Sequence, residues 1–243
     1  MRFLIFSLCA SLILYSCKVT QIAADKSLLY SNAIEDAMYV EKEEIDSNLI
    51  AITSFNQNLK RKIINDTEYV LVLSWIPQKF KYPDTGKYNT ANRETWVTVY
   101  PELLETMRTS NEKNVNLRLQ QLLGLPPTDP PNKLFIEFWV KPGDLFRPCP
   151  DKEIADSSCN LCFSKEDSLD KNHIEWITNK RLANYNCDGL FKHYPWTALG
   201  YTYDWNPENK NHKGLSEFII KKNSIIYVKR IIPTEEYLKE PVY

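Results

Sequence analysis

The chain has 243 residues, a formal net charge of −1, and 43% hydrophobic and 25% charged residues, which is an ordinary composition for a globular protein. No segment concentrates Lys and Arg, so we expect no nucleic-acid partner. Glycine is scarce, with 6 residues against 14 prolines, and the sequence holds no Walker loop, GxGxxG, GxSxG or HExxH motif. The common signatures of phosphate-binding, dinucleotide-binding and hydrolytic sites are therefore missing.

Residues 1–16 have the shape of a signal peptide. Arg2 supplies a positive charge, and an apolar run of about 13 residues follows from Phe3 to Tyr15. This run is shorter than the roughly 20 residues that a membrane-spanning helix needs, and the chain after it is polar. We therefore predict that residues 1–16 direct export and are then removed.

The end of this segment, Leu14-Tyr15-Ser16-Cys17, resembles the lipobox of bacterial lipoproteins. The resemblance implies that Cys17 becomes the lipid-modified first residue and anchors the protein to a bilayer outside the cytoplasm. Lys18 stands where lipoproteins of the inner membrane carry Asp, which favours the periplasmic face of the outer membrane. The alternative is an ordinary secretory signal in which Cys17 has no special role.

Residues 17–47 are predicted to be the lipidated N-terminus and a tether, and residues 48–243 a single globular domain. The first of these segments is polar and includes the charged run Glu41–Glu44. Some of its apolar residues nevertheless keep a partial helical spacing, so a helix docked on the domain is the alternative. These residues are Ala33, Ile34, Ala37, Met38 and Ile45.

Four of the six cysteines remain when the signal peptide and the lipidated residue are set aside, namely Cys149, Cys159, Cys162 and Cys187. An even number of cysteines in an oxidising compartment predicts two disulfides, and the two closely spaced cysteines are expected to pair with Cys149 and Cys187. The alternative is a zinc site, since Cys159 and Cys162 have knuckle spacing and His173 follows them. No second knuckle completes such a site, so we expect neither a metal nor another cofactor.

Two strands and a helix are predicted in the first half of the domain. Tyr69–Ile76 and Thr95–Tyr100 are rich in β-branched and aromatic residues, and a proline follows each of them. The segment Asn111–Leu123 has an apolar face of helical spacing, with Ser110 or Asn111 as the N-cap and Gly124 placed to end the helix.

The second half contributes three more strands and a helix. Residues 133–141 alternate between apolar and more polar positions, which predicts a half-buried strand, and residues 172–180 have helical spacing. Residues 215–221 and 224–230 flank Lys222-Asn223 and are expected to form a hairpin. Strands and helices without a βαβ rhythm predict an α+β domain with a mainly antiparallel sheet and two or three helices.

The aromatic segment 193–207 is a candidate ligand-binding surface. Trp196, Tyr201, Tyr203 and Trp205 can stack on a sugar ring or another planar ligand, or bind a protein partner, if they are exposed. We favour the interpretation that they form a corner of the hydrophobic core, in which Gly200 allows a tight bend, and a binding surface is the alternative. Residues 145–151, 194–205 and 214–218 resemble segments of uncharacterised bacterial proteins, and this resemblance implies no function.

Acidic residues close to the aromatic segment are the candidates for catalysis. Asp204 and Glu217 could form a carboxylate pair for acid and base chemistry, with His193 as a proton carrier. No motif spacing supports this pair specifically. We therefore expect a lipid-anchored protein that binds a protein or saccharide ligand, and the alternative is an extracytoplasmic enzyme, possibly directed at glycans.

Overall fold

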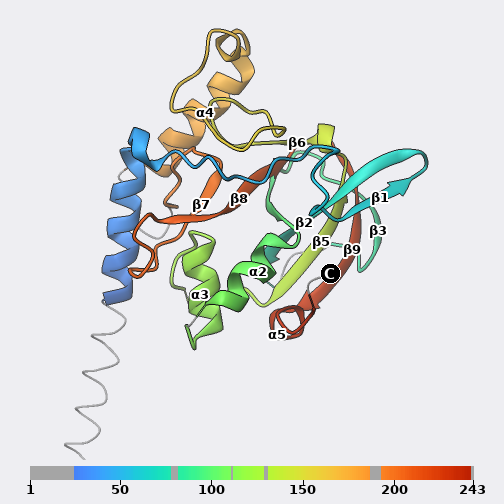
Figure 1. Cartoon of the computed structure of the whole chain (residues 1–243), viewed down its shortest axis with the longest axis horizontal. Coiled ribbons are helices and arrows are strands. Elements are labelled where there is room, and N and C mark those ends of the chain that lie inside the picture. The colour runs from blue at the N-terminus through green and yellow to red at the C-terminus, as the bar shows by residue number, and fades with distance from the viewer. Residues whose placement is uncertain (1–24, 78–81, 111, 129–130, 187–192, 242–243) are drawn as a thin grey trace, which may run out of the picture.

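The computed structural model describes residues 25–77, 82–110, 112–128, 131–186 and 193–241. It is an α+β fold with one large antiparallel sheet, which confirms the predicted fold class (Figure 1). Within the described residues the helices number more than the two or three expected. They are the helix of residues 25–38, α2 (Glu102–Thr109), α3 (Val115–Leu122), α4 (Lys171–Asn184) and α5 (Thr234–Tyr237).

Seven strands form the sheet in the order β3-β9-β5-β2-β4-β8-β6, with β1 paired to β2 and β7 paired to β8. The strands are β1 (Arg61–Ile64), β2 (Thr67–Ile76), β3 (Gly86–Asn89), β4 (Thr95–Val99), β5 (Leu134–Val140), β6 (Leu145–Phe146), β7 (Tyr201–Tyr203), β8 (Lys213–Ile220) and β9 (Ile225–Pro233). The predicted strands at β2 and β4 are confirmed, and β2 lies at the centre of the sheet, as its nearly continuous apolar sequence requires.

The predicted hairpin of β8 and β9 is wrong, because the two strands follow each other in the chain but are not neighbours in the sheet. β9 pairs with β5 and β3, whereas β8 pairs with β4, β6 and β7. Three strands therefore separate them, which in a flat sheet would place them about 19 Å apart. Residues 221–224 connect them, and a fully stretched connection of that length reaches only about 18 Å. The sheet must curl to bring the two strands together.

The turn between β8 and β9 is bound by the chain that follows β3. The Thr90 hydroxyl donates to the Lys221 carbonyl at 2.9 Å and accepts from the Ser224 amide at 2.9 Å. The Asn223 amide donates to the Ala91 carbonyl at 2.7 Å. The backbone hydrogen bonds of the turn are thus made with Thr90 and Ala91, and no hydrogen-bonded ladder joins β8 to β9.

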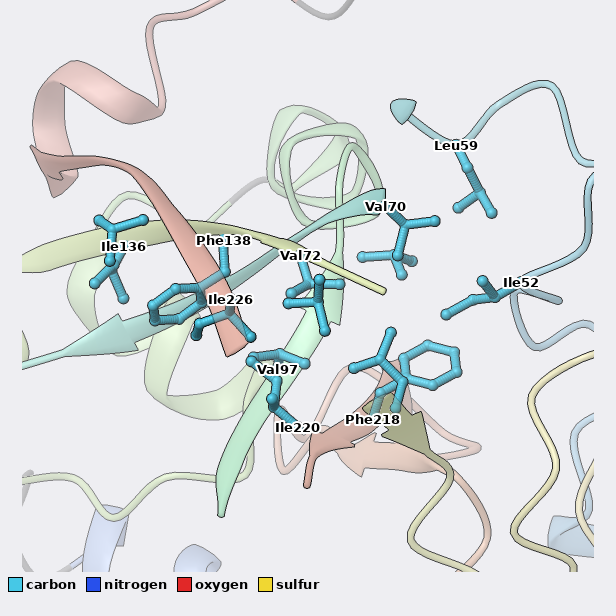
Figure 2. Close-up of a cluster of buried hydrophobic side chains, with 14 of the residues drawn as sticks. Ile52, Leu59, Val70, Val72, Val97, Ile136, Phe138, Phe218, Ile220 and Ile226 are labelled. Carbon is cyan, nitrogen blue, oxygen red and sulfur yellow. The ribbon is translucent and has the colours of Figure 1, made fainter. Parts of the chain in front are cut away.

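The curled sheet encloses an apolar core. Side chains from β2, β4, β5, β8 and β9 point toward one another there, as Figure 2 shows for Val72, Val97, Phe138, Phe218 and Ile226. All five side chains are buried. Because side chains alternate along a strand, the neighbouring residues of these strands face the opposite side of the sheet.

That opposite side is covered by α2, α3 and α5, and this corrects the prediction of a half-buried strand at β5. Phe135 and Trp139, on the face expected to be exposed, are buried in the core under these helices. Glu137 lies between them, fully buried, and its carboxylate is bound by Lys229 at 2.7 Å and by Arg230 at 2.6 Å. The alternating pattern therefore predicted exposure for a face of β5 on which even the charged Glu137 is buried.

Helix α3 begins later than predicted. Its N-cap is Asn114, whose side chain accepts a hydrogen bond from the Leu117 amide at 3.1 Å, and the helix ends before Gly124 (φ 62°), as predicted. Ser110 instead ends α2, a helix that the sequence analysis missed. Asn111 lies outside the described residues.

Helix α4 confirms the helix predicted at residues 172–180 and extends it. The Asp170 side chain caps its N-terminus by accepting from the His173 amide at 3.1 Å. Ile177 is buried, and Trp176 packs against two other tryptophans, so the helix is held to the sheet by aromatic contacts.

The N-terminal helix of residues 25–38 is docked on the domain, so the tether interpretation is wrong for this part of residues 17–47. Its inner face packs against Tyr203 and Trp205, beside β7 and α3 (Figure 1). The Tyr203 hydroxyl donates to Asp36 Oδ2 at 2.6 Å, and the Tyr30 hydroxyl donates to the His193 carbonyl at 2.8 Å. The segment docks despite its polar composition because its apolar residues lie on one face of the helix. The buried residues of that face are Tyr30, Ala33, Ile34 and Ala37.

Candidate functional site

A cavity of about 660 Å³ opens on the helix-covered side of the sheet. Residues of β2, β4 and β8 line one side of it, and the loop after α3, residues 194–196, residues 201–203 and the end of α4 line the rest. Cavities that hold small molecules in proteins span about 300 to 1,000 Å³ and are mostly apolar with a few placed polar groups. This cavity has the size and the character of such a site.

Strand alternation explains which side chains of β4 and β8 reach the cavity. Val97 points into the core of the curled sheet, so Trp96 and Thr98 point to the other side and line the cavity. On β8 the same rule turns Phe218 into the core and Glu217 toward the cavity. Thr98 and Glu217 are partners across the antiparallel pair, so the two polar side chains lie side by side.

Three buried polar atoms of the cavity lining have no hydrogen-bond partner among the residues that the structure describes. They are Thr98 Oγ1, Trp196 Nε1 and Glu217 Oε2. Thr98 is 4% exposed and Trp196 is 5% exposed. A buried polar group without a partner costs about 1–3 kcal/mol, so three at one cavity call for a ligand or ordered water that binds them.

The Glu217 carboxyl is the most unusual of the three groups. Burial raises its pKa to about 8, because the charged form loses hydration and no nearby positive group compensates for it. At neutral pH this side chain is therefore mainly a neutral carboxylic acid that can both donate and accept a hydrogen bond. Buried carboxyls of this kind are common at binding and catalytic sites.

Trp96 and Trp196 line the cavity wall near α4, and Trp176 packs against both of them. The rings of Trp96, Trp176 and Trp196 lie 6.0 to 6.3 Å apart, between centroids, and two of the three pairs are edge-to-face. Lys180 Nζ lies 5.8 Å from the Trp96 ring and 3.3 Å from Glu94 Oε2. Glu94 also accepts from Trp176 Nε1 at 2.9 Å, so its charge is already engaged.

All four aromatic residues are buried, which fits the core interpretation and not an exposed stacking surface. Trp205 belongs to the core, and its Nε1 donates to the Gln120 and Leu125 carbonyls. Tyr201 and Tyr203 are among the residues that line the cavity, but their hydroxyls bind the Glu44 carbonyl and Asp36. Of the four residues, Trp196 alone brings an unpartnered polar atom to the cavity.

The structure does not bring Asp204 and Glu217 together. Asp204 is 1% exposed and forms a bidentate ion pair with Arg118 at 2.7 and 2.8 Å. Asn209 adds a third side-chain hydrogen bond at 2.9 Å, so the carboxylate is fully used for structure. His193 is buried, and it is not among the described residues that line the cavity.

One of the disulfides fits the expected pattern, since Cys159 pairs with Cys149 and not with Cys162. Both sulfurs are buried, and closing a loop of this length contributes about 3 kcal/mol of stability in the chain-entropy account. Because Cys159 is in a disulfide, its sulfur is not available as a ligand for the alternative zinc site. His173, the other candidate ligand, contacts the Cys149 carbonyl through Nε2 at 2.8 Å. Cys17 and Cys187 lie outside the described residues, and Cys162 is exposed.

Sequence reasoning found Glu217 and Trp196 but missed Thr98, Trp96 and Lys180. Thr98 had a signal, because it is a polar residue inside an otherwise apolar strand and shares its face with Trp96. No sequence pattern could have identified Lys180, since only the tertiary packing of α4 brings its side chain close to Trp96.

No protein-family model matches the chain, and no curated protein or solved structure matches it. Among the described residues, no helix combines the length and the apolar character needed to cross a membrane.

Proposed function

We propose that this protein is an extracytoplasmic lipoprotein, anchored through Cys17, that binds a small and largely apolar molecule in the cavity beside Glu217. The main support for a ligand is that three buried polar atoms, on Thr98, Trp196 and Glu217, lack hydrogen-bond partners among the described residues. All three belong to residues that line one cavity of about 660 Å³. A void left by imperfect packing would be expected to have an apolar lining. Polar groups without partners instead match the pattern of a binding site that is complete only when filled.

A binding screen tests the proposed cavity. A set of one- and two-ring aromatic compounds, each with a single polar group, is expected to include ligands that quench tryptophan fluorescence and raise the melting temperature. The quenching has a physical reason, because Trp96 and Trp196 line the cavity. At a ligand concentration of 100 Kd, binding stabilises the protein by about 2.7 kcal/mol.

Two variants control this screen. Thr98→Phe places a ring in the part of the cavity beside Glu217 and is expected to abolish both signals, whereas Thr178→Val, at an exposed position of α4, is expected to preserve them. Compounds that stabilise the wild type and the Thr98→Phe variant equally would bind elsewhere. A screen without any cavity-dependent ligand would refute the proposed binding function.

The lipid anchor is tested by metabolic labelling with a palmitate analogue. Wild-type protein is expected to become labelled and to fractionate with membranes, and Cys17→Ala protein to remain unlabelled, because the cysteine sulfur is the acceptor of the diacylglyceryl group in lipoproteins. The unprocessed Cys17→Ala precursor should be visible by mass. Equal labelling of the two proteins would exclude the lipoprotein assignment.

A second candidate function is catalysis by Glu217 as a general acid or base. The observation that favours it is the pKa of about 8, which poises the carboxyl for proton transfer near neutral pH. A two-carboxylate glycosidase mechanism finds less support, since Asp204 is held by Arg118 and the other acidic residue of the described lining, Glu94, is held by Lys180. Conversion of a bound compound by wild type and not by Glu217→Gln would favour the enzyme.

A further inference from the structure

We infer that the ligand of the cavity is an uncharged ring compound with an acceptor oxygen, such as a carbonyl, and that Glu217 binds this oxygen as a carboxylic acid. The inference rests on the proposed function and specifies the chemistry of its ligand.

The types of hydrogen-bonding group in the cavity favour an acceptor on the ligand. The Trp196 indole N–H can only donate, and the Thr98 hydroxyl can donate or accept. Neither atom has a partner in the described part of the chain. Glu217 joins them as a donor at neutral pH, because burial raises the pKa of its carboxyl to about 8. All three groups can therefore donate, and an oxygen with two lone pairs can satisfy two of them at once.

The charges around the cavity disfavour a charged ligand. Glu94 and Lys180 compensate each other at 3.3 Å, and Arg93 stacks on the Tyr82 ring and donates to its hydroxyl at 3.2 Å. The titratable residues that line the cavity with Glu217 are Tyr82, Arg93, Glu94, Lys180, Tyr194, Tyr201 and Tyr203. Glu217 Oε2 has no hydrogen-bond partner among the described residues, and burial alone raises the pKa of this carboxyl, so a charged ligand would lose its hydration without a ready counter-charge.

One further acid lies close to the site through the β8 backbone. Both oxygens of Glu102 accept from the Ser216 amide at 3.0 Å, and burial raises the pKa of the Glu102 carboxyl to about 7. This group also titrates near neutral pH. The test must therefore compare wild type with a variant of Glu217 in which Glu102 is unchanged.

The apolar lining supports a ring compound. Edge-to-face packing at Trp96 and Trp196 leaves aromatic surface toward the cavity, next to Leu73, Leu103 and Leu125. A two-ring aromatic molecule fills part of 660 Å³ and leaves room for one polar substituent. Aromatic pairs contribute about 0.5–1.5 kcal/mol beyond the area that they bury.

Four probes of nearly equal shape test the inference. They are 2-acetylnaphthalene, 2-methylnaphthalene, 2-naphthoate and 2-naphthylmethylammonium, titrated calorimetrically against the wild-type mature protein at pH 6.5. We expect the ketone to bind at least tenfold more tightly than each of the other three. Only the ketone combines neutrality with an acceptor oxygen.

The pH dependence identifies the form of Glu217 that binds. Since affinity scales with the fraction of protein in the binding-competent state, the ketone should bind about thirtyfold more weakly at pH 9.5 than at pH 6.5. In Glu217→Gln the amide still donates but does not titrate, so the affinity should stay within about threefold of wild type at pH 6.5 and change little with pH. Glu217→Leu should bind the ketone at least tenfold more weakly than wild type.

The outcomes separate this inference from the proposed function. Tightest binding by the ammonium probe, with affinity that rises with pH, would overturn the inference in favour of ion pairing with ionised Glu217. Tightest binding by naphthoate would overturn it in favour of Arg93 or Lys180. If none of the four probes binds while other compounds of the screen do, the ring class is wrong and the binding function stands. If no compound binds at all, the proposed function itself fails.

Discussion

Glu217→Gln is expected to stabilise the fold above neutral pH, by up to about 3–5 kcal/mol at pH 9. Burial raises the pKa of Glu217 to about 8, whereas a glutamate in the unfolded chain titrates near about 4.3. Between these values the folded state binds a proton that the unfolded state has released, so wild-type stability falls as pH rises from about 4.5 to about 8. The variant lacks this loss. Urea unfolding of both proteins at pH 5, 7 and 9 measures the difference.

The pH-dependent part of the gain from Glu217→Gln should fall to about 1 kcal/mol at pH 5, because the acid is then protonated in the folded state but mostly ionised in the unfolded chain. Glu102 titrates in the same window, but it is present in both proteins and cancels in the difference. Glu175→Gln, at an exposed position of α4, is the matched control and should show no such pH-dependent gain. A difference between wild type and Glu217→Gln that does not change with pH would mean that Glu217 ionises freely in the folded protein.

Asp204→Asn is expected to destabilise the protein by about 3–5 kcal/mol, because it leaves the buried Arg118 without its counter-charge. Asp204 is 1% exposed, and two hydrogen bonds of 2.7 and 2.8 Å join it to the guanidinium. The pair connects α3 to the end of β7, so its loss loosens the contact between these elements. Chemical denaturation at pH 7, with fluorescence as the readout, gives the change in the free energy of unfolding.

The same substitution at a surface ion pair supplies the control. Glu68→Gln removes the partner of Arg61 at a site where the carboxylate side chain is 40% exposed, and it should cost less than about 1 kcal/mol. In the double variant Arg118→Met/Asp204→Asn the uncompensated charge is gone, so it should be no less stable than Asp204→Asn alone. Equal effects of Asp204→Asn and Glu68→Gln would show that burial of the pair contributes little.

The sequence contained the strands and the fold class but not the order of the strands. β2 and β4 could be located because β-branched and aromatic runs that end at a proline are a local property. The partner of β9 is not local. Lys222-Asn223 has the composition of a hairpin turn, yet Thr90, more than 130 positions earlier, takes the hydrogen bonds of the turn. Curling of the sheet then decides the neighbours.

The candidate site could be predicted only in part, for a related reason. Glu217 was identified as an acid near an aromatic segment, but its significance depends on burial and on Thr98, its partner across two strands that are more than 100 residues apart. Asp204 was an equal candidate in the sequence, but its carboxylate is held in a buried ion pair with Arg118. Which of two nearby carboxylates is free was decided by a residue on a distant helix.

The docked N-terminal helix changes how far the domain can stand from a bilayer. A tether of residues 17–47 would allow a reach of about 100 Å at full extension, whereas the distance from Cys17 to residue 25 cannot exceed about 29 Å. If Cys17 carries lipid, the domain stays near the headgroups. Tyr203 binds Asp36 of the helix and also lines the cavity, so the wall of the cavity is fixed to the element nearest the anchor. Apolar compounds that leave the same bilayer would then have a short path to the cavity.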